Sequence, residues 1–215
     1  APAPQTRQTA DERAPQELPV LLLYNIDPAW EPAEQEEAVT ATQELIDALR
    51  QVGHPVTPVQ VNDTDLRRFL SPYDPGRYVV LNWCEALPGI AHSDALAAET
   101  LEQMGYAYSG SPPPVLRLSG NKEKVKEALF RAGVPTPQGC VCTPERSAPW
   151  DRFPAIVKPL REHCSIGITP ESVVLDRDSL LERIRFVTDT YDQPALVEEF
   201  IDGREFRVTL WGNNE

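Results

Sequence analysis

Residues 18–24 read Leu-Pro-Val-Leu-Leu-Leu-Tyr, an uninterrupted apolar run with the length of a β-strand. Because neither face of this run is polar, it is typical of a strand buried on both faces of a parallel sheet. From Pro32 the apolar side chains take helical spacing, and Gly53 is placed to end that helix. Strand-like and helical segments continue to alternate, which predicts a parallel α/β layer over about residues 18–110.

The rest of this layer follows from shorter signals of the same kind. We expect strands at 54–61 and 78–83 and helices at 63–70 and 93–104, the second helix ending at Gly105. Prolines in the 54–61 segment remove backbone donors, so that strand is expected at an edge of the sheet.

The pattern changes after residues 111–114, Ser-Pro-Pro-Pro, which we interpret as a stiff connector. Beyond it the periodicity predicts helices, strands and one loop in a different order. They are a helix at 121–132, a strand at 153–158, a loop at 161–168, a helix at 178–190 and a strand at 195–200. Asp202-Gly203 indicates a hairpin turn into a return strand at 206–211, so this part is expected to be α+β with an antiparallel hairpin.

The expected organisation is therefore a disordered leader at 1–17, an α/β domain at 18–114 and a second, α+β domain at 115–215. The leader is polar and rich in alanine and proline, with too few large apolar side chains to pack. It also lacks the apolar centre of a secretory signal, so we expect a cytoplasmic protein. The four cysteines follow neither a disulfide nor a zinc spacing and are expected to be free, mostly structural thiols.

The net charge of the chain limits the classes of partner that it is expected to bind. The 215 residues carry 20 Lys and Arg against 33 Asp and Glu, a formal net charge of −13. Such a surface repels phosphate backbones and anionic headgroups, which argues against nucleic acid and membranes as partners. No apolar run reaches the roughly 18 residues of a membrane span. A local basic pocket for a small phosphate ligand stays compatible with this balance.

Lys158 is the first candidate for such a pocket. It ends an apolar strand and shares a face with Ile156, where a lysine needs an anion or must reach out to solvent. The loop at 161–168 follows, and its Ser165 and Gly167 would let backbone N–H groups approach a phosphate. From the residues alone, a phosphate ligand and a solvated lysine are equally compatible with this pattern.

Two further features carry charge in unusual places. Glu198 and Glu199 lie in an apolar strand, one on each face, where buried carboxylates need donors such as an adenine amino group or ribose hydroxyls. An edge hairpin with solvated glutamates is the alternative. Lys122 lies in the first turn of a predicted helix, an unfavourable place for a cation without a nearby anion. With Lys124 and Lys126 as neighbours, it could equally be a solvated surface lysine.

Three stretches together carry a family resemblance: an Asn-Lys pair opening a helix, a strand ending in Lys-Pro with its loop, and a strand with paired glutamates. They are residues 121–137, 153–167 and 197–206. In this order and spacing they resemble the ATP-grasp superfamily, specifically the D-alanine–D-alanine ligase-like branch. Residues 81–85 and 106–111 are similar to the N-terminal domain of that branch, so the resemblance covers about 20–215.

The resemblance implies a Rossmann-like pre-ATP-grasp domain followed by the small α+β lobe of an ATP-grasp domain. It implies that Lys122 and Lys158 contact ATP phosphates, that the loop clamps the triphosphate, that Glu198 meets the adenine amino group and that Glu205 binds ribose. Residues 199–201 would form the adenine hinge. The implied ATP-binding set is Lys122, Ile156, Lys158, Glu162, Ser165, Ile166, Gly167, Glu198, Glu199, Phe200, Ile201 and Glu205; Cys164 is a candidate for substrate contact.

The implied reaction is carboxylate–amine ligation through an acyl phosphate, with ATP, Mg²⁺ and a small amino-acid or peptide substrate; the resemblance leaves a homodimer open. His163 and Cys164 stand where the family usually carries small residues, and residues 25–30 replace its glycine-rich acidic segment. D-Alanine specificity is therefore not implied, and a ligase for another amino acid or peptide is an alternative.

The resemblance does not extend to the family's catalytic side chains. The family's catalytic and metal-binding side chains come from a later segment, so we expect the Mg²⁺ ligands beyond residue 215, assign no catalytic or metal-binding residue, and expect the chain to be a fragment. A truncated nucleotide-binding protein without turnover is the second alternative. An NAD-dependent oxidoreductase is disfavoured, because the three-glycine dinucleotide fingerprint is missing from the sequence.

Overall fold

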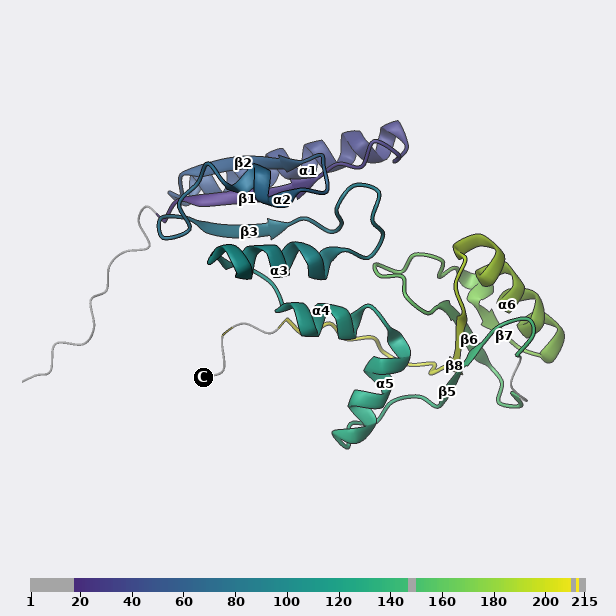
Figure 1. Cartoon of the computed structure of the whole chain (residues 1–215). Helices are drawn as coiled ribbons and strands as arrows, with labels where there is room; N and C mark the ends of the chain where they lie inside the picture. Colours follow the sequence, from purple (N-terminus) through teal and green to yellow (C-terminus); the bar gives the residue numbers. More distant parts are fainter. Residues whose placement is uncertain (1–17, 147–149, 210–211, 213–215) are drawn as a thin grey trace, which may run out of the picture. The chain divides into compact units, whose positions relative to one another are not determined.

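The computed structural model describes residues 18–146, 150–209 and 212 (Figure 1). They fall into two compact units that divide between Arg117 and Leu118. The leader predicted at 1–17 lies outside the described residues.

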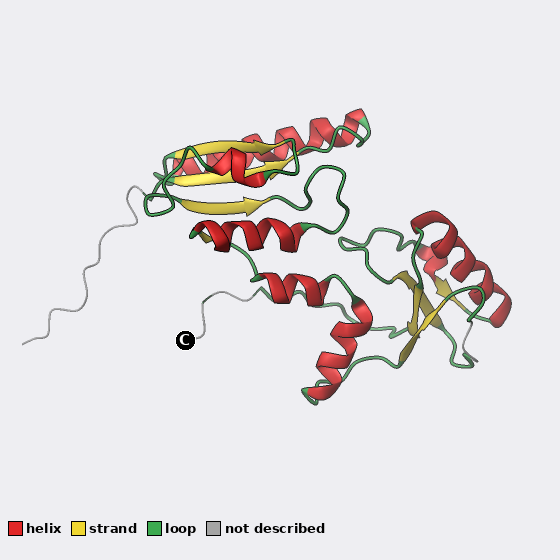
Figure 2. Cartoon of the chain, in the orientation of Figure 1, coloured by secondary structure: helices red, strands yellow, loops and turns green. Residues whose placement is uncertain are grey.

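The first unit is built on a parallel sheet of four strands in the order β2-β1-β3-β4. Its strands are β1 Val20–Asn25, β2 Val56–Val61, β3 Val79–Trp83 and β4 Ala107–Tyr108 (Figure 2). The apolar run quoted first in the sequence is thus a central strand, and the proline-containing strand lies at the edge. Both predictions are confirmed.

Helices bury both faces of this sheet. On one face α1, Pro32–Gln51, packs its Ile46 against Val20 and Leu22 of β1. On the other face α2, Leu66–Leu70, and α3, Asp94–Met104, contribute to a core that contains Leu21 and Leu23. Gly105 ends α3 at φ +81°, a left-handed conformation that glycine adopts without steric penalty.

The connector predicted at 111–114 is wrong in its second half. Pro113 and Pro114 form the first turn of α4, Pro113–Ser119. The fixed φ of proline suits the first turn of a helix, where the missing N–H has no partner to lose. A proline run therefore began a helix where we expected a linker.

The second unit holds an antiparallel sheet in the order β5-β8-β6-β7. Its strands are β5 Gly139–Cys142, β6 Ala155–Pro159, β7 Val173–Val174 and β8 Ala195–Glu199; its helices are α5 Lys122–Arg131, the short 3₁₀ helix η1 Pro170–Ser172 and α6 Arg177–Tyr191. Side chains of α6 such as Ile184 pack against Val157 and Val197. The chain thus combines one parallel and one antiparallel sheet in a mixed α/β fold.

The return strand predicted at 206–211 is wrong for its described part. Residues 204–209 form no strand, and residues 210–211 lie outside the description. The sheet order gives the reason, because β8 has β5 on one edge and β6 on the other. A hairpin partner has no free edge of β8 to pair with, and strands form only where backbone donors find a ladder.

Within the described part of the chain, no helix has both the length and the apolar character needed to cross a bilayer.

Candidate nucleotide-binding site

The two faces of the antiparallel sheet differ in chemistry. Alternate residues of β6 and β8, Val157 and Val197 among them, pack into the core beneath α6. Their neighbours point the other way, because successive side chains of a strand alternate between faces. We call this second face the lysine face; it carries Ile156, Lys158, Leu196 and Glu198.

Glu198 is the centre of the lysine face. Its side chain is 7% exposed, and each carboxylate oxygen has an ammonium partner. Lys126 Nζ lies 2.5 Å from Oε1, and Lys158 Nζ lies 2.5 Å from Oε2. Burial alone would raise the pKa of the Glu198 carboxyl, but hydrogen bonds from the two lysines outweigh it and hold the pKa below its usual range. Glu198 is therefore an ionised, buried carboxylate, and Lys158 finds its anion within the chain.

Lys122 joins the first turn of α5 to the end of β6. Its backbone N–H donates to the Leu160 carbonyl oxygen at 3.2 Å, and its Nζ donates to the carbonyl oxygens of Pro159, at 2.9 Å, and Glu162. Burial lowers the pKa of the Lys122 ammonium, and the nearby charge of Lys158 lowers it further. The structure thus brings the two predicted lysines into one electrostatic neighbourhood, although they are 36 residues apart in the sequence.

Lys126 is the residue that sequence reasoning missed. It is not a solvated neighbour of Lys122: its side chain is only 16% exposed and binds Glu198. Asn121 caps α5, accepting from the backbone N–H of Glu123 at 3.0 Å and of Lys124 at 3.2 Å. The signal in the sequence was the i, i+4 spacing of Lys122 and Lys126, which places both on one side of the helix.

The loop at 161–168 forms a tight turn beside this cluster. Cys164 and Ser165 have left-handed backbone angles, φ +52° and +63°, and both side chains are exposed. Ile166 N–H donates to the His163 carbonyl oxygen at 3.0 Å, so this amide faces its own loop. The hydroxyl of Ser165 and the thiol of Cys164 are thus accessible to solvent.

Gly167 fixes the end of that loop. Its φ is +74°, and a Cβ at this position would lie 2.7 Å from Pro159 Cγ and 2.9 Å from the ring of Tyr191. The Gly167 carbonyl oxygen accepts from Nη2 of the buried Arg183 at 2.8 Å, and this guanidinium also donates to Ser172 Oγ. The loop is therefore anchored to α6 at position 167, where any residue other than glycine would be strained.

The remaining predicted residues divide into anchored and exposed ones. Glu162 accepts from Gln193 Nε2 at 2.7 Å, and Glu199 accepts from Arg152 Nη1 at 2.7 Å on the side away from Glu198. Phe200 N–H donates to the Pro154 carbonyl oxygen at 3.0 Å. Ile201 and Glu205 are exposed and lie in the stretch without regular structure, so the structure does not bring them to Glu198.

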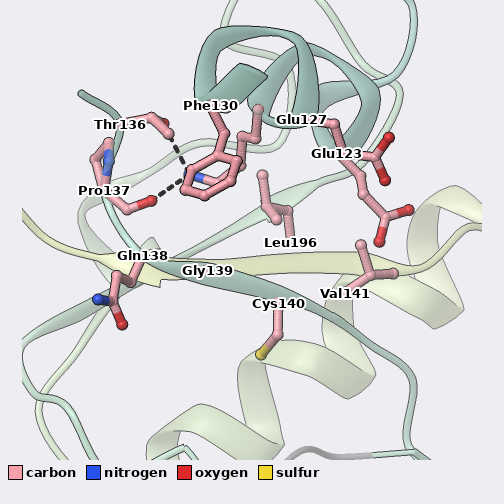
Figure 3. A pocket seen from close by; sticks show the side chains of 11 residues that line it. Glu123, Glu127, Phe130, Thr136, Pro137, Gln138, Gly139, Cys140, Val141 and Leu196 are labelled. Atoms are coloured by element: carbon pink, nitrogen blue, oxygen red, sulfur yellow. Dashed lines mark hydrogen bonds between the residues drawn. The ribbon is translucent and has the colours of Figure 1, made fainter. Parts of the chain in front are cut away.

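A pocket of about 410 Å³ opens between α5 and the sheet (Figure 3). Phe130, Glu123 and Glu127 of α5 lie above it, while Val141 and Leu196 form part of its floor. Cys140 points to the opposite side of β5.

The four cysteines are free, as predicted, and burial raises the pKa of Cys140 and of Cys84 to about 12. These two thiols are therefore protonated and unreactive at neutral pH.

Comparisons with known proteins place this geometry in a family. Residues 141–215 match the family described as D-ala D-ala ligase C-terminus. An uncharacterized protein, y4sG, from Sinorhizobium fredii is 33% identical over 180 residues, which are 80% of this chain and 52% of that protein. The D-alanine–D-alanine ligase of Gluconobacter oxydans is 31% identical over 84% of this chain and 58% of its own length. The chain thus spans a little over half the length of these relatives.

Solved structures show the same fold. The D-alanine–D-alanine ligase of Bacillus anthracis aligns with a TM-score of 0.67 and 22% identity, over 87% of this chain and 58% of that one. The same ligase complexed with ATP aligns with a TM-score of 0.65 and 24% identity, over 87% of this chain and 57% of that one. The family resemblance seen in the sequence is confirmed: the chain is similar to D-alanine–D-alanine ligases in sequence, and it shares their fold.

Proposed function

We propose that the lysine face binds ATP and that the chain supplies the nucleotide-binding part of an ATP-dependent carboxylate–amine ligase. The observation that carries this proposal is the cluster around Glu198. Three ammonium groups, those of Lys122, Lys126 and Lys158, gather around the carboxylates of Glu198 and Glu162 in a chain of net charge −13. A local excess of cations in an acidic protein favours a small polyanion as the ligand.

The proposed contacts follow from which side chains have spare bonding capacity. Lys158 and Lys122 would meet the phosphates, and the turn at 161–168 would close over them through Ser165 and, once Ile166 N–H leaves the His163 carbonyl oxygen, through the backbone at 166–167. Glu198 would accept from the adenine amino group beside the apolar side chain of Ile156. Residues 199–201 would form the hinge along the base, and the exposed Glu205 would reach the ribose.

The proposed chemistry uses ATP to activate a carboxylate. The substrate carboxylate attacks the γ-phosphorus, the bond to the bridging oxygen of ADP breaks, and an acyl phosphate forms. An amine then attacks the acyl carbon and inorganic phosphate leaves, so that an amide bond results. Fixed ammonium groups and N–H dipoles stabilise the charge that develops on the transferring phosphoryl group.

Mg²⁺ is the usual partner of ATP in such transfers. Among the residues that the structure describes, no group of three His, Cys, Asp or Glu side chains could hold a metal ion. The described residues therefore do not form such a site by themselves, and no residue is assigned to Mg²⁺. No step above is assigned to the metal.

The first unit, with its parallel sheet, is proposed to be the Rossmann-like pre-ATP-grasp domain. The substrate is proposed to be a small amino acid or peptide. At the end of β1, Asn25 is buried and its Oδ1 accepts from Glu85 N–H at 3.0 Å. This bond ties the turn after β1 to the segment after β3.

A cytoplasmic location, where ATP is available and thiols stay reduced, fits the free cysteines.

Calorimetric titration with ATP tests the binding proposal, and Lys158→Ala is the test variant. Loss of its charge–phosphate contact should weaken ATP binding by about 1.5–3 kcal/mol, roughly 10- to 150-fold. Lys124→Ala is the matched control, because Lys124 is an exposed lysine of the same helix as Lys122. Unchanged ATP affinity in Lys158→Ala would contradict the assigned site. ADP release with Mg²⁺ and a panel of amino acids then tests the ligase activity and identifies the substrate.

A further inference from the structure

The two lysines on Glu198 are bonded differently. Lys126 Nζ donates to Thr136 Oγ1 at 3.0 Å, to the Pro137 carbonyl oxygen at 2.5 Å and to Glu198 Oε1 at 2.5 Å. An ammonium group has three hydrogens, so these acceptors use all of them. For Lys158 Nζ, by contrast, the described residues supply one partner, Glu198 Oε2. Lys126 is therefore fixed in place, whereas Lys158 can turn toward another anion.

This asymmetry matters for the nucleotide-binding site proposed above. When Lys158 turns to a phosphate, Glu198 loses one of its two cations. Without Lys126, this carboxylate, which is 7% exposed, would then be unpaired, and burial would favour its protonation. A protonated carboxyl is a poorer acceptor for a base amino group. Lys126 stays bonded to Oε1, so it keeps Glu198 charged and oriented while Lys158 is used elsewhere.

Gly139 makes room for this contact. A Cβ on Gly139 would lie 2.7 Å from the Val197 carbonyl oxygen, 2.9 Å from Glu198 Cγ and 3.4 Å from Lys126 Cε. Real Cβ atoms do not approach backbone oxygen that closely, so any other residue here would displace Glu198 or β8. The backbone of β5 thus lies against the Lys126–Glu198 pair because position 139 lacks a side chain.

We propose that Lys126 is a positioning residue that fixes Glu198 as the acceptor for the amino group of adenine, and so sets the preference for adenine over guanine nucleotides. Adenine presents an amino group at the position where guanine presents a carbonyl oxygen. A charged carboxylate accepts from the first and repels the second. The inference rests on the proposed function, since it needs a nucleotide on the lysine face.

The test compares the dissociation constants of ATP, GTP and inorganic triphosphate by calorimetry. Lys126→Met should lose at least tenfold in ATP affinity, and this loss should exceed that for triphosphate by fivefold or more. The ratio of ATP to GTP affinity should fall toward one. Lys124→Met, which removes an exposed lysine from the same helix, should keep the wild-type ratio.

A second variant separates position from charge. Gly139→Ala keeps all three lysines but crowds Glu198, so it should also reduce the ATP to GTP ratio while triphosphate binding changes less than threefold. It carries the test alone if Lys126→Met does not fold. Equal losses for ATP and triphosphate in Lys126→Met, or an unchanged nucleotide preference in both variants, would overturn the positioning role. If the wild-type chain binds neither ATP nor triphosphate, the proposed function itself fails.

Discussion

The central strands of the two sheets show how the two units differ. In β1, Val20 and Leu22 pack toward α1, while Leu21 and Leu23 pack into the core on the other face. In β8, Ala195 and Val197 pack into the core beneath α6, whereas Leu196 and Glu198 lie on the lysine face, where Glu198 pairs with Lys126 of α5. A strand buried on both sides contributes stability alone. A strand with one polar face can also present charge to a ligand.

The largest expected effect separates the two units. Leu22→Ala removes a fully buried side chain between sheet and helix and should destabilise the first unit by about 2–5 kcal/mol. Hydrogen exchange read strand by strand should show faster exchange in β1 and β3 and unchanged exchange in β6 and β8. Equal acceleration in both sheets would show that the units do not behave independently.

The next effect separates the two faces of β8. Glu198→Gln leaves Lys126 and Lys158 without their counter-charge and should destabilise the second unit by roughly 2–4 kcal/mol, because breaking a buried ion pair from one side is unfavourable. Glu199→Gln is the control on the next residue, and its loss should be much smaller, since its partner Arg152 is 50% exposed. Thermal unfolding measures both. Similar losses at the two positions would remove the distinction between the faces.

A smaller effect is expected where the loop joins the sheet. Gly167→Ala forces a Cβ against Pro159 and Tyr191 at a positive φ and should destabilise the second unit by about 1–3 kcal/mol. Gly203→Ala is the control, because a Cβ there meets no atom within 4 Å. If both variants unfold at the same temperature as the wild type, the anchoring of the loop at Gly167 is wrong.

The smallest effect is a difference in pH dependence. The native pKa of Glu198 lies below its ordinary value of 4.5, so the folded state binds fewer protons than the unfolded state over this interval. Its stabilisation is therefore complete above the unfolded pKa and is lost as pH falls through the native pKa. Denaturation at a series of pH values below about 5 should show a shallower loss for Glu198→Gln than for the wild type. Parallel curves would contradict the lowered pKa.

The sequence predicted most of the elements because their signals are local. The apolar run of β1 and the terminal glycine of α3 lie within single elements. The pairing of Lys126 with Glu198 joins residues 72 positions apart, so no local pattern contains it. The return strand was predicted wrongly for the same reason. The turn signal at Asp202-Gly203 is local, whereas the free edge that a return strand needs depends on whether β5 and β6 already pair with β8.

The central claim is that the lysine face binds a nucleoside triphosphate between Lys122, Lys158 and Glu198. A crystal structure with a non-hydrolysable ATP analogue tests it most directly. The account predicts phosphate oxygens within hydrogen-bond distance of Nζ of both Lys122 and Lys158, the base amino group on Glu198, and Lys126 still bonded to Oε1. An analogue bound elsewhere, or Lys158 still paired with Glu198 beside a bound triphosphate, would contradict it.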